Sequence, residues 1–149
     1  MRSLLLVVTL GFQAVFLGCA ISGGSRTGSD SQIASDVRRS FEIGLSDLVR
    51  SPRIPKWPIY TANYSCFWVP ASAERIIEIG PRALPILESL KQLSDLPRMS
   101  LALSCIAIIG GKDVEKGPYK VDPGTGVRYV SYFVPVQLIP TDMSAPLTR

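Results

Sequence analysis

The sequence predicts an α+β domain behind a short N-terminal export segment. Two observations support this fold class. Apolar residues recur at helical spacing through the middle of the chain, and the last third changes to runs rich in Val, Tyr and Phe around a Gly-rich turn. The chain has 149 residues, of which 46% are hydrophobic and 19% charged, so it is long enough for one small globular domain.

The first residues have the pattern of an export signal. Met1 and Arg2 give a positive start, and an apolar run follows from Leu4 to Leu17. At about 1.5 Å per residue this run is too short to cross about 30 Å of hydrocarbon, whereas a cleaved signal needs only a short apolar region. We therefore expect residues 1–18 to be removed as a signal peptide.

The residues at the predicted cut, Phe16-Leu17-Gly18-Cys19-Ala20, resemble the lipobox of bacterial lipoproteins. The resemblance implies that Cys19 is lipidated and anchors the protein to a membrane. In a Gram-negative cell, Ala20 after the cysteine implies the outer membrane. Two alternatives are a secreted protein cut near Gly18 or Ala20 by the ordinary signal peptidase, and an uncleaved anchor helix that continues through Ile21.

A tether and a first helix are predicted next. Residues 19–35 are rich in Gly and Ser, and we expect them to form a flexible tether. A helix is predicted from Asp36 to Val49, because Pro52 stops it and apolar residues recur at spacings of three and four. The residues of this apolar stripe are Ile33, Val37, Phe41, Leu45 and Leu48.

Residues 50–70 are rich in proline and aromatic residues. Four prolines, the last of them Pro70, predict that neither a helix nor a central strand runs through this segment. Its rings could line a groove for a peptide or glycan, or fold over the helices as a lid that completes the core. The candidate binding residues are Trp57, Tyr60, Tyr64, Trp68 and Arg53.

Three shorter helices are predicted over residues 71–79, 81–93 and 97–109. Pro81 and Pro97 stand in the first turns of the second and third of these helices, and Gly80 and Gly110 follow the ends of the first and third, which is the usual arrangement at helix termini. Pro85 should either interrupt the second of these helices or mark its true start.

The C-terminal part predicts a β-hairpin. Residues 119–121 and 127–138 form its strands around a Gly-rich turn, and Pro135 and Pro140 should limit the second strand to a sheet edge. The domain is then expected over residues 36–140, with a frayed tail at 141–149.

Residues 76–90, Ile-Ile-Glu-Ile-Gly-Pro-Arg-Ala-Leu-Pro-Ile-Leu-Glu-Ser-Leu, resemble the short HEAT-like helical repeat, and residues 95–110 resemble its second helix. The resemblance implies a helical hairpin, and repeats of this kind commonly bind proteins through a concave surface. The expected architecture is therefore a HEAT-like helical hairpin, preceded by one helix and followed by the β-hairpin.

Cys66 and Cys105 remain if Cys19 is lipidated. In an oxidising envelope they could form a disulfide across roughly 40 residues. The favoured interpretation is that Cys105 lies in the core as a small, unpaired hydrophobic residue.

The composition also restricts the function. The chain has no histidine, which excludes Ser-His and Cys-His catalysis and His-ligated metal sites, and we expect no metal or cofactor. A net charge of +4 gives no reason to expect a nucleic-acid partner. The prediction is a non-enzymatic, lipid-anchored binding or scaffolding module with a protein or peptide partner. Alternatives are an envelope hydrolase or glycan-processing accessory protein that uses Glu74, Glu78 or Asp95, and a purely structural secreted protein.

Overall fold

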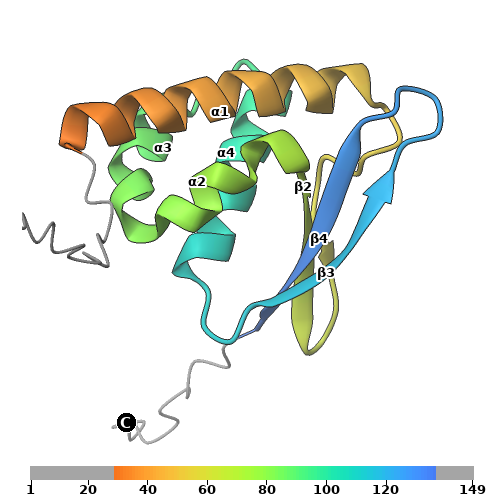
Figure 1. Cartoon of the computed structure of the whole chain (residues 1–149). Coiled ribbons are helices and arrows are strands. Elements are labelled where there is room, and N and C mark those ends of the chain that lie inside the picture. The colour runs from red at the N-terminus through yellow and green to blue at the C-terminus, as the bar shows by residue number, and fades with distance from the viewer. Residues whose placement is uncertain (1–28, 137–149) are drawn as a thin grey trace, which may run out of the picture.

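The computed structural model describes residues 29–136. The signal segment, Cys19 and the tail at 141–149 lie outside the described residues. A layer of helices covers one face of an antiparallel sheet, and none of the described helices lies on the other face (Figure 1). The predicted α+β class is confirmed. Within residues 29–136, no helix is both long and apolar enough to cross a membrane.

The first helix, α1 (Asp30–Arg50), begins earlier than the predicted start at Asp36. Ser29 is its N-cap, and the Ser29 side chain accepts a hydrogen bond from the backbone N–H of Gln32 at 3.3 Å. Ile33 packs against the core one turn before Val37, which favours the extension. The last residues of the predicted tether are therefore helical.

The three shorter helices are present at nearly the predicted positions. Pro85 lies in the first turn of its helix, so it marks the start and does not interrupt the helix. Gly80 adopts φ +70° where the chain turns between two helical segments, a conformation that favours glycine. The segments are a short 3-10 turn η1 (Ala71–Ala73) before α2 (Glu74–Ile79), a second turn η2 (Gly80–Ala83) before α3 (Leu84–Leu90), and α4 (Leu96–Gly110). Of these, α3 and α4 pack together as a helical hairpin.

The described part of the chain contains one four-stranded antiparallel sheet in the order β1-β2-β4-β3. Its strands are β1 (Ile59–Tyr60), β2 (Tyr64–Pro70), β3 (Glu115–Val121) and β4 (Arg128–Pro135). The C-terminal hairpin was predicted, although β3 begins before residue 119. The strands β1 and β2 were not predicted.

Two predictions from proline were wrong. The segment 50–70 does contain a central strand, because β2 pairs with β1 on one side and with β4 on the other. The strand β4 is also central and not at an edge. In both strands the proline, Pro70 or Pro135, is the final residue, so it does not break the hydrogen-bond pattern inside the strand.

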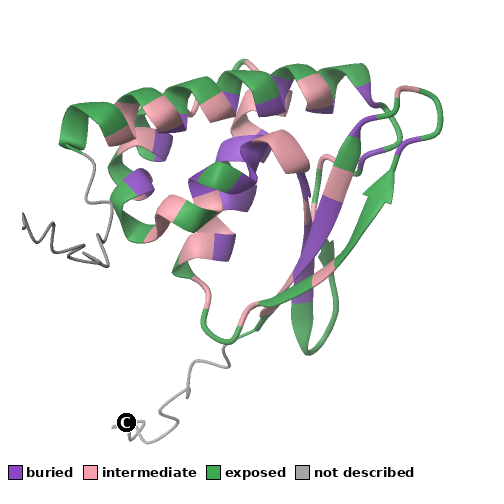
Figure 2. Ribbon diagram, viewed as in Figure 1, coloured by how far each residue is buried: buried purple, intermediate pink, exposed green. Residues whose placement is uncertain are grey.

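The core lies between the helices and one face of the sheet. Successive side chains of the two central strands point to opposite faces of the sheet, so every second residue points at the helices. Among these are Phe67 and Val69 of β2 and Val130 and Tyr132 of β4, which pack with the buried face of α1. Figure 2 shows buried residues in the helices and along the central strands β2 and β4, whereas β3 is almost wholly exposed. The opposite residues of the same strands form the face without helices.

Candidate binding surface

Four aromatic side chains come together on the helix-free face of the sheet. We call them the aromatic face: Tyr64 and Trp68 of β2, and Tyr129 and Phe133 of β4. They share a face because strand residues alternate and β2 and β4 pair in register, with Trp68 opposite Ser131. The rings of Tyr64 and Phe133 meet edge to face, with centroids 5.4 Å apart and planes at 83°.

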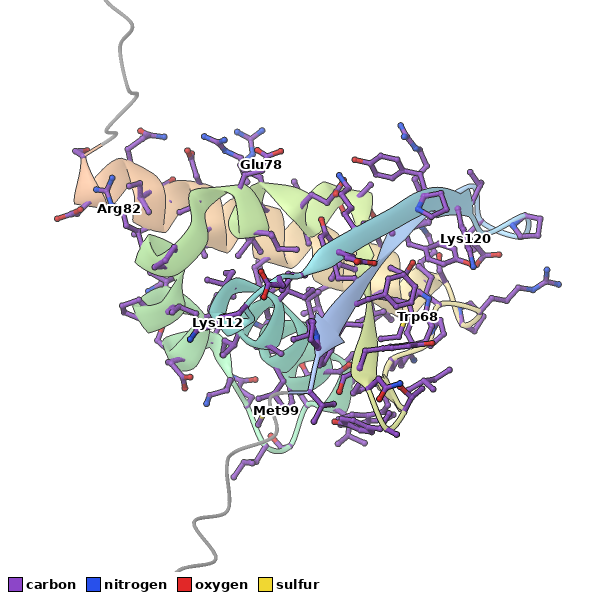
Figure 3. The ribbon with its side chains drawn as sticks, turned by 90° about the horizontal axis from the view of Figure 1, so that it is seen from below. Trp68, Glu78, Arg82, Met99, Lys112 and Lys120 are labelled. Carbon is purple, nitrogen blue, oxygen red and sulfur yellow. The ribbon has the colours of Figure 1, made fainter. Side chains whose placement is uncertain are left out.

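Neighbouring strands extend this surface. Ile59 of β1 pairs with Cys66, and Lys120 of β3 pairs with Tyr129, so both belong to the same side. In Figure 3, Trp68 and Lys120 lie on the side of the sheet away from the helices. Cys66 and Ser131 are only 6% and 5% exposed, although none of the described helices covers them. The larger side chains around them therefore cover the small residues and form the surface.

The structure brings some of the predicted binding residues together. Tyr64 and Trp68 share the aromatic face, and Tyr60 pairs with Ser65, which places it on the other side of the sheet. Trp57 and Arg53 lie on the exposed loop before β1.

The lid interpretation is wrong for two of the rings. Trp57 and Tyr60 are 53% and 73% exposed, so they do not complete a core. The loop does contribute to the core, but through Ile54, which is 1% exposed. Trp57 and Tyr60 thus remain accessible, and Tyr60 lies on the side of the sheet opposite the aromatic face.

Sequence reasoning missed Tyr129 and Phe133. Residues 128–135 read Arg-Tyr-Val-Ser-Tyr-Phe-Val-Pro. In a strand, Val130, Tyr132 and Val134 point to one face and the residues between them point to the other. That alternation was a usable signal, since it places Tyr129 and Phe133 on the face opposite the core. It could not tell which strand would pair beside them.

Both described cysteines are free, buried thiols. Burial raises the pKa of Cys105, in α4, to about 12. Burial also raises the pKa of Cys66, in β2, and the charge of Lys120 offsets part of that rise. Neither thiol is therefore disposed to act as a nucleophile at neutral pH. The structure does not contain the alternative, a disulfide between Cys66 and Cys105.

Glu74 is the centre of a polar cluster on the helix side of the sheet. Its carboxylate accepts hydrogen bonds from the hydroxyls of Tyr119 at 2.6 Å and Tyr132 at 2.8 Å, and pairs with Lys116 Nζ at 2.7 Å. A bulge in β3 between Lys116 and Tyr119 puts both side chains on the Glu74 side. The cluster therefore ties the first turn of α2 to β3 and β4.

The hydrogen bonds of this cluster also shift its pKa values. Burial acts to raise the pKa of Glu74, but the hydrogen bonds from Lys116, Tyr119 and Tyr132 outweigh it and lower the pKa. In return, the hydrogen bond to Glu74 is the main cause that raises the pKa of Lys116 to about 12. Glu74 is thus held ionised, which suits a structural ion pair better than a general acid.

The three acids considered for hydrolysis have separate partners. Glu78 pairs with Arg75 at 3.1 Å, and Asp95 caps α4 by accepting from the backbone N–H of Arg98 at 3.1 Å. Glu74 contacts the sheet as described above. Across residues 29–136, no group of three His, Cys, Asp or Glu residues is placed to hold a metal ion.

The helical layer has a hollow of its own, of about 430 Å³ between α1 and α2. Its charged residues are largely engaged in ion pairs along the rim, such as Arg82 with Asp30 at 2.7 Å. The residues that line it are Gln32, Ile33, Asp36, Arg75, Glu78, Ile79 and Arg82. A second hollow, of about 370 Å³, lies beside it between α1 and α3 and shares Ile33 and Arg82 with the first.

Comparison with known proteins adds no assignment: no family model matches the chain, and neither a curated protein nor a solved structure matches it.

Proposed function

We propose that this chain is a lipid-anchored protein of the cell envelope whose domain binds a protein or peptide partner through the aromatic face. The observation that carries the proposal is the set of aromatic side chains on a sheet face that no described helix covers. Aromatic residues are enriched at protein interfaces, because each buries a large area with few rotatable bonds.

The polar surroundings of the aromatic face fit the same role. Lys120 lies on this face and Glu115 begins β3, so charged groups border an apolar centre. An apolar centre with a polar rim is the ordinary anatomy of a protein interface. Ile59, which is 56% exposed and pairs with Cys66, extends the apolar area at the β1 side.

A helical binding surface, as the HEAT-like resemblance implies, remains the second candidate location. The hollow between α1 and α2 supports it. Its rim residues already pair with one another, as Arg75 does with Glu78, so a partner would have to replace those contacts. The aromatic face presents its rings without such competition, and for that reason we place the site there.

Lipidation at Cys19 would hold the domain close to a membrane. The residues between Cys19 and the start of α1 can span at most about 35 Å when fully extended. In a Gram-negative cell we propose the outer membrane as the location, and a secreted form is the alternative.

The anchor is tested by changing Cys19 to Ser. We expect the wild-type protein to incorporate a fatty-acid analogue and to gain the mass of a lipidated N-terminus, because the thiol is the attachment point. The Cys19→Ser protein should incorporate none and should leave the membrane fraction. Intact-mass measurement distinguishes the alternatives: an unmodified mature chain beginning after residue 18 or 20 would mean secretion, and lipid on the Ser variant would refute the assignment.

The binding site is tested by photo-cross-linking in the native envelope. A photo-reactive amino acid at position 68 should give a discrete protein adduct, whereas one at Leu93, which is 90% exposed on the loop after α3, should give none. Replacing Tyr64 with alanine should reduce the position-68 adduct several-fold by removing a neighbouring ring. The unfolding transition of each variant shows whether it is folded. Equal adducts at both positions, or none at position 68 in a folded protein, would contradict the proposal.

A further inference from the structure

The outer edge of β3 is open along its length. Within the described residues, β3 pairs only with β4, and the strand order puts it at the end of the sheet. Almost every residue of β3 is exposed, so no helix or loop of the described chain covers this edge (Figure 2). An edge of this kind can accept another extended chain through backbone hydrogen bonds.

The register shows which backbone groups face outward. The N–H of Asp122 donates to the carbonyl of Val127, so that pair is a hydrogen-bonded one. Hydrogen-bonded and non-hydrogen-bonded pairs alternate along an antiparallel ladder. The backbone N–H and C=O groups of Tyr119 and Val121 therefore point away from β4. These two residues are also 44% and 56% exposed, which gives an incoming chain apolar side chains to cover.

The charges along this edge are mainly positive. Lys120 and Arg128 form no ion pair with any described residue, and Arg128 lies over the ring of Tyr119 at 4.6 Å. The nearby carboxylate of Glu74 is already neutralised by Lys116. Glu115 is the acidic residue of the strand, and it lies at the opposite end from Val121.

Local geometry limits the open edge to its second half. Pro118 has no N–H, and the bulge between Lys116 and Tyr119 interrupts the regular ladder. The opposite edge of the sheet, β1, has only two residues. The segment from Tyr119 to Val121 is therefore the part of the sheet best suited to strand addition.

We propose that the β3 edge binds an extended, acidic peptide segment of a partner protein, which pairs with Tyr119 and Val121 and places carboxylates against Lys120 and Arg128. This surface shares Lys120 with the border of the aromatic face but uses none of its four rings, and its test does not depend on the function proposed above. The short pairing length means that affinity should come largely from the charges, and we expect it to fall as salt concentration rises.

The test uses the chain from residue 20 and a fluorescent octapeptide of repeating Glu-Glu-Val-Val. Neighbouring glutamates of such a strand point to opposite faces, as Lys120 and Arg128 do in the sheet. We expect saturable binding by anisotropy, with chemical-shift changes or slowed hydrogen exchange at the amides of Tyr119 and Val121. An octapeptide of repeating Lys-Lys-Val-Val should not bind. Eight glutamates, which match the sign of charge but not the strand propensity, should bind at least about tenfold more weakly than the Glu-Val peptide.

Charge-reversed variants locate the site. Lys120→Glu combined with Arg128→Glu should weaken binding of the Glu-Val peptide about tenfold, since two favourable charge contacts become repulsive. The matched control, Arg38→Glu with Arg39→Glu on the exposed side of α1, should leave the affinity within twofold. Equal loss in both variants, equal binding of the eight-glutamate peptide, or shifts confined to the aromatic face would each overturn the proposal. Loss of the position-68 cross-link without loss of peptide binding would instead count against the aromatic face alone.

Discussion

Replacing Glu74 with alanine is expected to lower the free energy of unfolding by about 2 to 4 kcal/mol, the range for removing one partner of a buried ion pair or hydrogen-bond network. The side chain of Glu74 is only 11% exposed, and two tyrosine hydroxyls and Lys116 converge on it. The variant leaves the buried hydroxyl of Tyr132 without its acceptor and removes the tie between α2 and the sheet. Urea denaturation followed by circular dichroism measures the loss.

Glu78→Ala provides the matched control on the same helix. Glu78 is 63% exposed and its ion pair with Arg75 lies at the surface, so its loss should change the free energy of unfolding by less than about 0.5 kcal/mol. A Glu74→Gln variant should lie between the two, because the amide still accepts a hydrogen bond but carries no charge. If Glu74→Ala and Glu78→Ala destabilised equally, the cluster would not hold the sheet to the helices.

The same carboxylate predicts a pH dependence with a definite sign. The pKa of Glu74 is lower in the folded protein than its ordinary value of 4.5, so the folded state binds a proton on this group less readily than the unfolded state. Its contribution to stability is therefore complete above pH 4.5 and is lost as the pH falls through the lower folded-state pKa. In Glu74→Gln this part of the acid dependence should be absent.

Replacing Gly44 with alanine is expected to destabilise the protein by about 1 to 3 kcal/mol, although Gly44 lies inside α1. Helix propensity alone predicts the opposite sign, because alanine favours a helix interior by about 1 kcal/mol over glycine. A Cβ at this position would lie 2.7 Å from the Cβ of Ala73, which is much closer than such atoms approach. The helix would have to move away from η1, and the buried contacts between them would loosen.

A double variant tests this explanation directly. Gly44→Ala combined with Ala73→Gly removes the clash, and we expect it to recover part of the loss relative to Gly44→Ala alone, measured as a double-mutant cycle. Gly110→Ala is the control, since nothing lies within 4 Å of a Cβ built there, and its stability should change little. A Gly44→Ala protein more stable than wild type would mean that α1 does not pack this closely on η1.

The helices were predictable because their signals are local. The apolar stripe of α1, the prolines at first turns and the glycines after helix ends all act within a few residues. The earlier start of α1, at Asp30 in place of the predicted Asp36, also has a local cause, because Ser29 caps the helix. Ser29 lies in the segment that its Gly and Ser content predicted to be a tether. Of the two outcomes expected for Pro85, the structure shows the second: Pro85 lies in the first turn of α3 and marks the start of that helix.

The sheet was less predictable, and the reason lies in pairing between distant residues. The strand β2 pairs with β4 along its length, with Tyr64 opposite Pro135, so its central place depends on a segment near the other end of the chain. A proline rule applied to the whole segment 50–70 could not show that Pro70 would be the last residue of a strand.

The sequence by itself determined the helical segments, the C-terminal hairpin and the residue types that serve as candidates for binding, because period, capping and turn chemistry act locally. The tertiary structure decided which of those candidates act together. Strand pairing set Tyr64 and Trp68 beside two rings that the sequence had not selected, and it left Tyr60 on the other side. It also turned Glu74 from a catalytic candidate into a tie between helix and sheet, since only folding brings Tyr119 and Tyr132 to its carboxylate.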